Sequence, residues 1–224
     1  MMTYPFRLDQ GHPFVSIDGA DWLLVTGAPS SFGNRAVLVM GKETIPIANQ
    51  YMGLTAETLS SYVGRETAGI IGCDIINRHE VCMDVPAGSI TFSSEALPLT
   101  ALTLPVKNFM GVPIIQVTTG ELERTMALFF DTGAQISYLP ARELQGLPSE
   151  GDIEDFYPGF GTFTTATYRV PLSLGGRQTS LRCGCLPDML AMTLGLAGTQ
   201  GILGNEILLQ QAVSYHPARA LLCL

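Results

Sequence analysis

The chain has 224 residues, 46% of them hydrophobic and only 14% charged, which excludes a disordered chain and an extended coiled coil. Twenty acidic residues outnumber twelve scattered basic ones, giving a net charge of −8. Because a nucleic-acid backbone is bound by clustered Lys and Arg, we expect no nucleic-acid partner.

Other sequence features argue against a membrane and a metal. The longest uncharged stretch, residues 189–205, contains four glycines and is a poor candidate for a membrane span. The first ten residues lack the apolar segment of a secretory signal, so we expect a cytoplasmic protein with no membrane partner. The cysteines stand at no zinc-ligand spacing, and neither a metal nor a cofactor is expected. They are Cys73, Cys82, Cys183, Cys185 and Cys223.

The 24 glycines and 14 prolines interrupt the chain often, which favours an all-β architecture with short elements. Short apolar or alternating runs predict strands at residues 14–17, 21–25, 35–40, 81–85 and 89–92. Helices are expected at 56–63, with Thr55 as N-cap, and at 140–145 and 187–194, which both begin with proline. The uncharged segment 97–105 is interpreted as the connection between two halves.

Two motifs recur in the same order in the two halves. Residues 22–32, WLLVTGAPSSF, resemble residues 128–138, LFFDTGAQISY, in which an apolar strand enters a Thr-Gly-Ala turn. Further along, GIIG at 69–72 matches GILG at 201–204. The spacing between the two motifs is longer in the second half, by about 26 residues. The repeat predicts two similar lobes.

Asp131 is the candidate catalytic residue. It follows the apolar run 126–130, so its carboxylate emerges from a buried strand, where an unpaired charge is costly. An isolated Asp-Thr-Gly is usually a solvated turn, in which Asp accepts backbone N–H groups and Gly takes a positive φ. The buried strand and the duplicated arrangement favour a functional role instead.

With these motifs the chain resembles the aspartic peptidases, and Ala134 makes the second motif more similar to the retropepsin branch than to pepsin. The resemblance covers nearly the whole chain, from about residue 14 to residue 224. It implies a mainly β fold with a few short helices and two pseudo-twofold-related, acid-protease-like lobes, residues 1–105 and 106–224. In that family each lobe gives one loop to the floor of a cleft, and a hairpin flap closes over an extended peptide.

The resemblance also implies roles for individual residues. Thr26, Gly27, Thr132 and Gly133 match the residues that brace the two loops across the axis. Segment 158–170 is rich in Gly, Thr and aromatic residues and lies in the extra length of the second half. It is interpreted either as an ordinary edge hairpin or as the flap. The flap candidates are Gly159, Phe160, Gly161 and Thr162.

The sequence departs from the family at the catalytic centre, where Val25 stands in place of the first aspartate. The family's hydrolysis needs two carboxylates that share one proton, because like charges about 3 Å apart cannot both ionise. Valine supplies neither an acid nor a base, and the nearby Asp18 and Asp21 precede the turn. We therefore expect Asp131 to be the sole retained catalytic aspartate, without a replacement partner.

The leading hypothesis is a non-catalytic relative, a pseudopeptidase, whose cleft binds an extended peptide or an unfolded polypeptide as a monomer. The alternative is an active aspartic endopeptidase, either through a homodimer that pairs two Asp131 loops or because Val25 is an introduced substitution. A structural protein with a vestigial cleft is the third hypothesis. Saturable peptide binding without cleavage would separate the first hypothesis from the other two.

Overall fold

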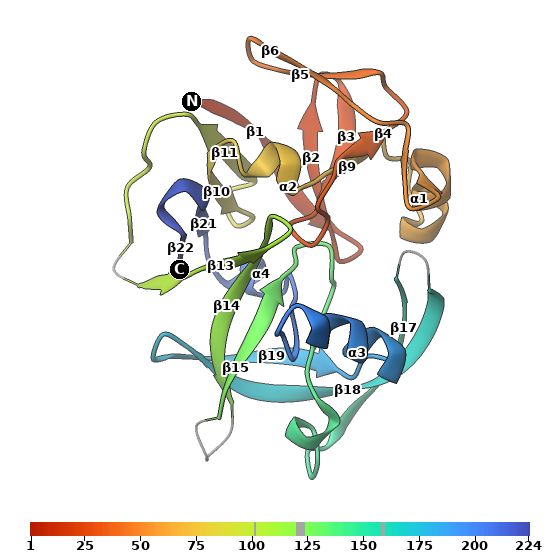
Figure 1. The fold of residues 1–224 in the computed structure, drawn as a ribbon, viewed down its shortest axis with the longest axis vertical. Coiled ribbons are helices and arrows are strands. Elements are labelled where there is room, and N and C mark those ends of the chain that lie inside the picture. The colour runs from red at the N-terminus through yellow and green to blue at the C-terminus, as the bar shows by residue number, and fades with distance from the viewer. Residues whose placement is uncertain (101, 120–123, 158–159) are drawn as a thin grey trace.

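The computed structural model describes residues 1–100, 102–119, 124–157 and 160–224. Within these ranges the chain is mainly β, with two large sheets, two small hairpins and a few short helices (Figure 1). No helix of the described residues is long and apolar enough to cross a membrane. The all-β, two-lobed fold expected from the sequence is confirmed.

Both large sheets combine strands that are far apart in the sequence. The order across the first sheet is β12 (Thr103–Pro105), β22 (Leu221–Cys223), β21 (Val213–His216), β10 (Glu80–Asp84), β11 (Ser89–Ser93), β1 (Met2–Asp9), β2 (His12–Ile17), β3 (Ala20–Leu24), β9 (Gly69–Ile71) and β4 (Phe32–Gly33). The order across the second is β13 (Lys107–Phe109), β14 (Val112–Thr119), β15 (Arg124–Phe130), β20 (Gly201–Leu203), β16 (Ser137–Tyr138), β19 (Arg177–Gly184), β18 (Gly161–Leu174) and β17 (Ser149–Tyr157). The small hairpins are β5 (Val37–Met40) with β6 (Glu43–Pro46), and β7 (Gln50–Tyr51) with β8 (Leu54–Thr55).

The helices are α1 (Ala56–Val63), α2 (Cys73–Ile76), α3 (Asp188–Leu196) and α4 (Ile207–Gln210). Helix α1 has the expected bounds: Thr55 Oγ1 accepts the Thr58 N–H at 3.2 Å, and Gly64 ends the helix with a φ of 67°. Helix α3 begins one residue later than expected and ends two residues later. The helix expected at 140–145 is a single 3₁₀ turn, Ala141–Glu143, and a second such turn spans Pro217–Arg219.

The two repeated motifs form the same structure in both halves. Strand β3 pairs in parallel with β9, and β15 pairs in parallel with β20. The Val25 N–H donates to the Ile71 carbonyl at 3.0 Å, and the Asp131 N–H donates to the Leu203 carbonyl at the same distance. Each Thr-Gly-Ala loop therefore leaves its strand next to the glycine that follows the partner strand, Gly72 or Gly204. The same strand pairing and the same hydrogen bond thus occur in both halves, as expected for two lobes related by a pseudo-twofold axis.

The last strands of the chain lie in the sheet of the first half. Strand β21 pairs antiparallel with β10, so residues 213–223 extend the first sheet. Glu80 on β10 reinforces this junction, because its carboxylate accepts hydrogen bonds from His216 and Arg219. The division of the chain between residues 105 and 106 stays a prediction.

The core of the molecule extends through both halves. Its main cluster joins buried side chains such as Trp22 and Phe92 to Val117 and Phe130. A smaller cluster of buried apolar side chains from the first half lies beneath the cleft described below. It consists of Phe14, Leu23, Phe32, Leu54, Leu59, Val63 and Ile70.

Candidate ligand-binding cleft

Two threonines join the Thr-Gly-Ala loops. Thr26 Oγ1 donates to the Phe130 carbonyl at 2.6 Å and accepts the Thr132 N–H at 2.9 Å. Thr132 Oγ1 donates to the Leu24 carbonyl at 2.5 Å and accepts the Thr26 N–H at 3.0 Å. Both threonines are fully buried, so these four hydrogen bonds form without competition from water. They hold the two loops together within one chain.

Two glycines allow the loops to approach each other. A Cβ built on Gly27 would lie 2.1 Å from the Asp131 carboxylate, and one built on Gly133 would lie 2.7 Å from a methyl group of Val25. Real Cβ atoms do not come this close to other heavy atoms, so glycine is required at both positions by packing. The same contacts place Val25 and Asp131 at equivalent positions on a common floor.

Asp131 is half-buried at this floor, and its Oδ1 accepts the N–H groups of Gly27 at 3.1 Å and Gly133 at 2.8 Å. Burial raises the pKa of Asp131 to about 6, against the lowering effect of these hydrogen bonds. The charge of Asp155 adds to the rise. Asp131 therefore changes between a hydrogen-bond donor and a pure acceptor near neutral pH.

Each loop has a matching support beneath it. The thiol of Cys73 lies 3.0 Å from the Thr26 carbonyl, and Asn205 Nδ2 donates to the Thr132 carbonyl at 2.9 Å. Burial, together with the charge of Asp131, raises the pKa of Cys73 to about 12. Because the thiolate is the reactive form of cysteine, this thiol is inert at neutral pH and supports the loop.

Two cavities meet at the floor. They have volumes of about 100 and 250 Å³, and Val25, Asp131 and Tyr157 line both. The larger cavity is further lined by apolar residues of both halves, among them Tyr51, Met52, Phe109, Met110, Phe129 and Leu194. The smaller is further lined by His12, Leu59, Val63, Tyr138, Asp155 and Phe156. Together they form a cleft between the halves, with Asp131 at the floor that both cavities share and Asp155 in the smaller cavity.

The β17–β18 hairpin crosses from the second half to the first. Phe156 on β17 stacks on Tyr62 of α1, with ring centroids 4.4 Å apart and planes 10° from parallel. Figure 1 shows the upper end of β17 directly beneath α1. The neighbouring Asp155 carboxylate accepts a hydrogen bond from the Tyr138 hydroxyl of its own half. The hairpin is thus held at both sides of the cleft.

The flap candidates lie on or beside this hairpin. Gly161 and Thr162 begin β18 and pair with Tyr157 and Phe156, while Phe160 is 43% exposed. Gly159 lies outside the described residues. The hairpin residues nearest the floor, Asp155 to Tyr157, precede the predicted segment and were missed. The available signal was the acidic run that ends in the adjacent pair Phe156 and Tyr157 just before Pro158.

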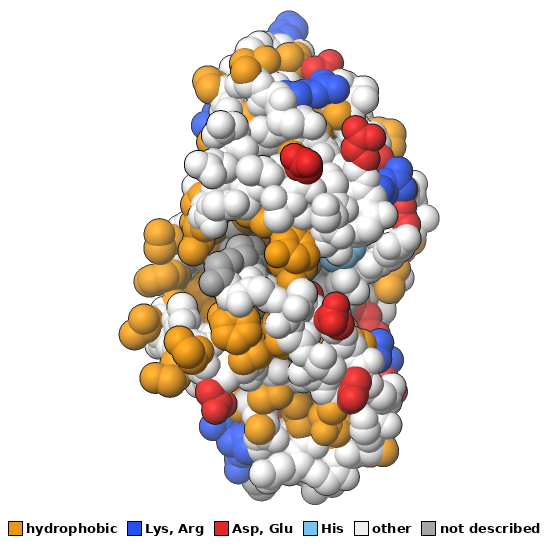
Figure 2. All heavy atoms as spheres, turned by 90° about the vertical axis from the view of Figure 1, so that its right-hand side faces the viewer, with side chains coloured by type: hydrophobic (Ala, Val, Ile, Leu, Met, Phe, Trp, Pro, Cys, Tyr) orange, Lys and Arg blue, Asp and Glu red, His pale blue; other side chains and the backbone are white. Residues whose placement is uncertain are grey.

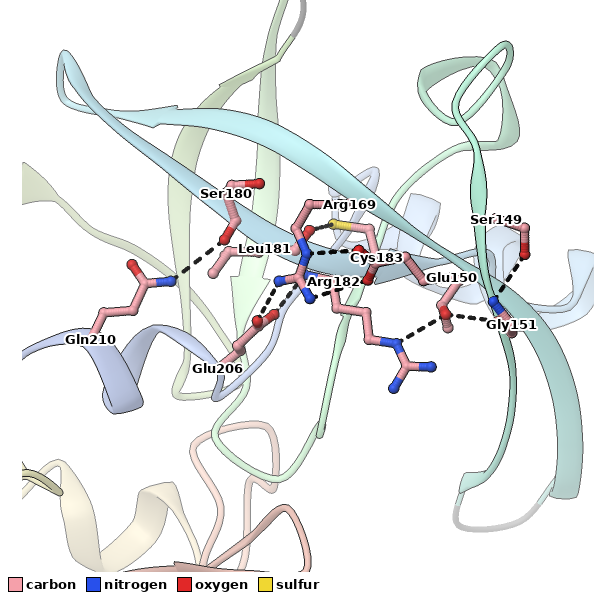
Figure 3. Close-up of polar contacts among 11 residues, drawn as sticks. Ser149, Glu150, Gly151, Arg169, Ser180, Leu181, Arg182, Cys183, Glu206 and Gln210 are labelled. Carbon is pink, nitrogen blue, oxygen red and sulfur yellow. Dashed lines mark hydrogen bonds and ion pairs between the residues drawn. The ribbon is translucent and has the colours of Figure 1, made fainter.

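The base of the hairpin is fixed by an ion-pair network. Arg169 on β18 binds Glu150 on β17 at 3.1 Å and Glu206, which precedes α4, at 2.6 Å. Glu206 also accepts the backbone N–H of Arg182 on β19 at 2.5 Å. Figure 3 shows these groups gathered where β18 and β19 pass the loop before α4. No carboxylate of this network lines either cavity, so we assign it a structural role.

Among the described residues, no group of three or more His, Cys, Asp or Glu side chains is arranged to hold a metal ion. His12 lies at the smaller cavity, where its Nε2 is 3.0 Å from Nε2 of Gln135. Burial lowers the pKa of His12, so it is neutral at pH 7. Sequence reasoning did not single out His12, because its place at the cleft comes from the pairing of β1 with β2.

Neither the protein-family models nor the sequences of curated proteins match this chain. Among solved structures, basic 7S globulin from soybean superposes with a TM-score of 0.52 over 99% of this chain and 93% of that chain. The chain has a pepsin-like fold. At 10% identity this similarity concerns the fold alone. The chemistry of the floor therefore has to be argued from the residues themselves.

Proposed function

We propose that this chain is a pseudopeptidase, which binds extended polypeptide segments in the cleft over the paired loops and does not hydrolyse them. One observation carries the proposal. The threonine brace that aligns the two loops is complete, whereas the floor pairs Asp131 with Val25. Hydrolysis by a carboxylate pair needs an acid and a base that share a proton, and valine replaces one of them.

The surroundings of the floor support a peptide as the ligand. Strand β17 is the last strand of its sheet, and its residues Asp155, Phe156 and Tyr157 line the smaller cavity. An extended peptide binds such an edge through main-chain hydrogen bonds, while cavities receive its alternate side chains. Tyr157 lines both cavities, and two neighbouring cavities fit this alternation.

Asp131 has a binding role in this proposal. Its Oδ1 is held by two backbone N–H groups, and below its pKa of about 6 the carboxyl is protonated. A protonated carboxyl donates a hydrogen bond to a peptide carbonyl, whereas the ionised form repels that oxygen. Peptide affinity is therefore expected to rise as the pH falls through about 6.

The homodimeric peptidase is the second candidate, and the brace argues against it. The Asp131 loop already has a partner loop in its own chain, to which it is joined by four buried hydrogen bonds. Pairing two Asp131 loops would require all four to break. A monomer that binds peptide would support our proposal, while a dimer with Asp131-dependent cleavage would support the peptidase.

Fluorescence anisotropy with a mixed pool of labelled ten-residue peptides tests the proposal. We expect saturable binding to the parent chain that strengthens as the pH falls through about 6. Binding to Asp131→Asn should not depend on pH in this range, because its amide stays neutral and can donate a hydrogen bond at every pH. Asp152→Asn is the matched control, because it makes the same substitution at an exposed position of β17 outside both cavities and should keep the pH dependence of binding. Absence of saturable binding to the parent chain would contradict the proposal.

A further inference from the structure

Helix α3 is apolar on two faces. Its inner positions Leu190 and Leu194 are buried, as in an ordinary amphipathic helix. Its outer positions Met189, Met192 and Leu196 are 73%, 74% and 84% exposed. Their spacing of three and four residues places them in one row, which we call the outer strip. A solvated helix face normally carries polar residues, so the outer strip is a candidate contact surface.

The outer strip is continuous with the larger cavity of the cleft. Thr193, Leu194 and Ala197, which alternate with the strip along the same segment, line that cavity. Across the cavity its wall includes Met52 and Met110, which are 65% and 70% exposed. In Figure 2 hydrophobic side chains gather along the left edge, which corresponds to the front of Figure 1, where α3 lies.

The charges at this surface restrict the partner. Among the described residues that line the larger cavity, Asp131 is the only charged one, and Asp188 is the only charged residue in α3. The whole chain carries a net charge of −8. An acidic segment is therefore repelled, and a segment with neutral or basic flanks is not. The flexible thioether side chains of the methionines adapt to apolar groups of different shapes.

We propose that the outer strip of α3 is a docking surface for the apolar flank of the same extended polypeptide that enters the larger cavity. This inference rests on the proposed function, because the cleft must hold a polypeptide before its flank reaches the strip. The nine residues of α3 span about 13 Å, the length of about four residues of extended chain. The recognised segment thus has about four apolar residues beyond the cavity, followed by neutral or basic ones.

Two labelled twelve-residue peptides test this inference. Both carry the same apolar centre and terminal lysines, but one has a flank of Leu and Phe and the other a flank of Ser and Gln. The double variant Met192→Gln, Leu196→Gln adds no charge that could attract the terminal lysines, and it is expected to bind the apolar-flank peptide at least about tenfold more weakly. Its affinity for the polar-flank peptide should not change. Leu209→Gln is the matched control, since Leu209 is 58% exposed on α4 and lines neither cavity.

The outcomes separate this inference from the proposed function. Equal binding of the two peptides by the parent chain, or an unchanged affinity in the double variant, would overturn the docking role of α3 alone. Displacement of the apolar-flank peptide by palmitate at lower concentration than by unlabelled peptide would also overturn it, in favour of a lipid. If neither peptide binds the parent chain, the proposed function itself fails. Circular dichroism of each variant confirms that it is folded.

Discussion

The buried carboxylate at the cleft floor makes the stability of this protein depend on pH in a defined direction. Burial raises the pKa of Asp131 from 3.8 to about 6, so the folded chain binds a proton that the unfolded chain has lost between these values. Stability from this group is complete below pH 3.8 and is lost as the pH rises through about 6. The difference corresponds to about 3 kcal/mol of unfolding free energy.

Asp131→Asn removes this titration while keeping the shape of the side chain. We expect the stability of the variant relative to the parent chain to increase by about 2 to 2.5 kcal/mol between pH 4 and pH 7, since part of the full difference is already lost at pH 4. Urea unfolding followed by tryptophan fluorescence measures both proteins across this range, and Trp22 in the main core is the reporter. The difference between the two stabilities cancels the contributions of other titrating groups. Glu80 is one of these, because its partners Arg219 and His216 hold its pKa low despite its burial. Parallel stability profiles for the two proteins would refute the assignment of a raised pKa to Asp131.

Three further substitutions test the geometry of the cleft. Val25→Asp is expected to introduce Asp131-dependent cleavage of denatured casein between about pH 3 and 7, because the brace holds the two positions on one floor; a folded but inactive variant would contradict this. Gly27→Ala is expected to lower stability by about 1–3 kcal/mol in thermal or urea unfolding, since its Cβ would meet the Asp131 carboxylate, and an unchanged stability would show that the loops are not in contact. Phe156→Ala removes the stack on Tyr62, so stopped-flow measurements should show faster peptide association, and a rate equal to that of the parent would mean that the hairpin does not limit entry.

The local elements of the fold were predictable from the sequence. The repeated Thr-Gly-Ala and Gly-Ile-Ile/Leu-Gly motifs predicted two similar halves, and the Thr55 cap predicted where α1 begins. The position of β21 and β22 in the first sheet was not predictable, because strands about 130 residues apart pair through contacts that leave no local pattern.

At the candidate site, too, the sequence predicted local features but not the contacts between distant segments. The sequence indicated that Val25 replaces an aspartate, but not that Asp155 lies at the same cavity as Asp131. Asp155 reaches the cavity because β17 turns back over the cleft and Tyr138 binds its carboxylate. The role of Met52 at the larger cavity was equally hidden, since the β7–β8 hairpin that carries it has only two residues in each strand.

The central claim is that the cleft holds a peptide without cutting it, and the mass of a bound peptide tests this most directly. The parent chain is incubated at pH 5 with a labelled ten-residue peptide at a concentration that saturates the anisotropy signal, and the same sample is then analysed by mass spectrometry. We predict a saturated signal and a peptide of unchanged mass after prolonged incubation. Fragments that appear with the parent chain and not with Asp131→Asn would contradict the account.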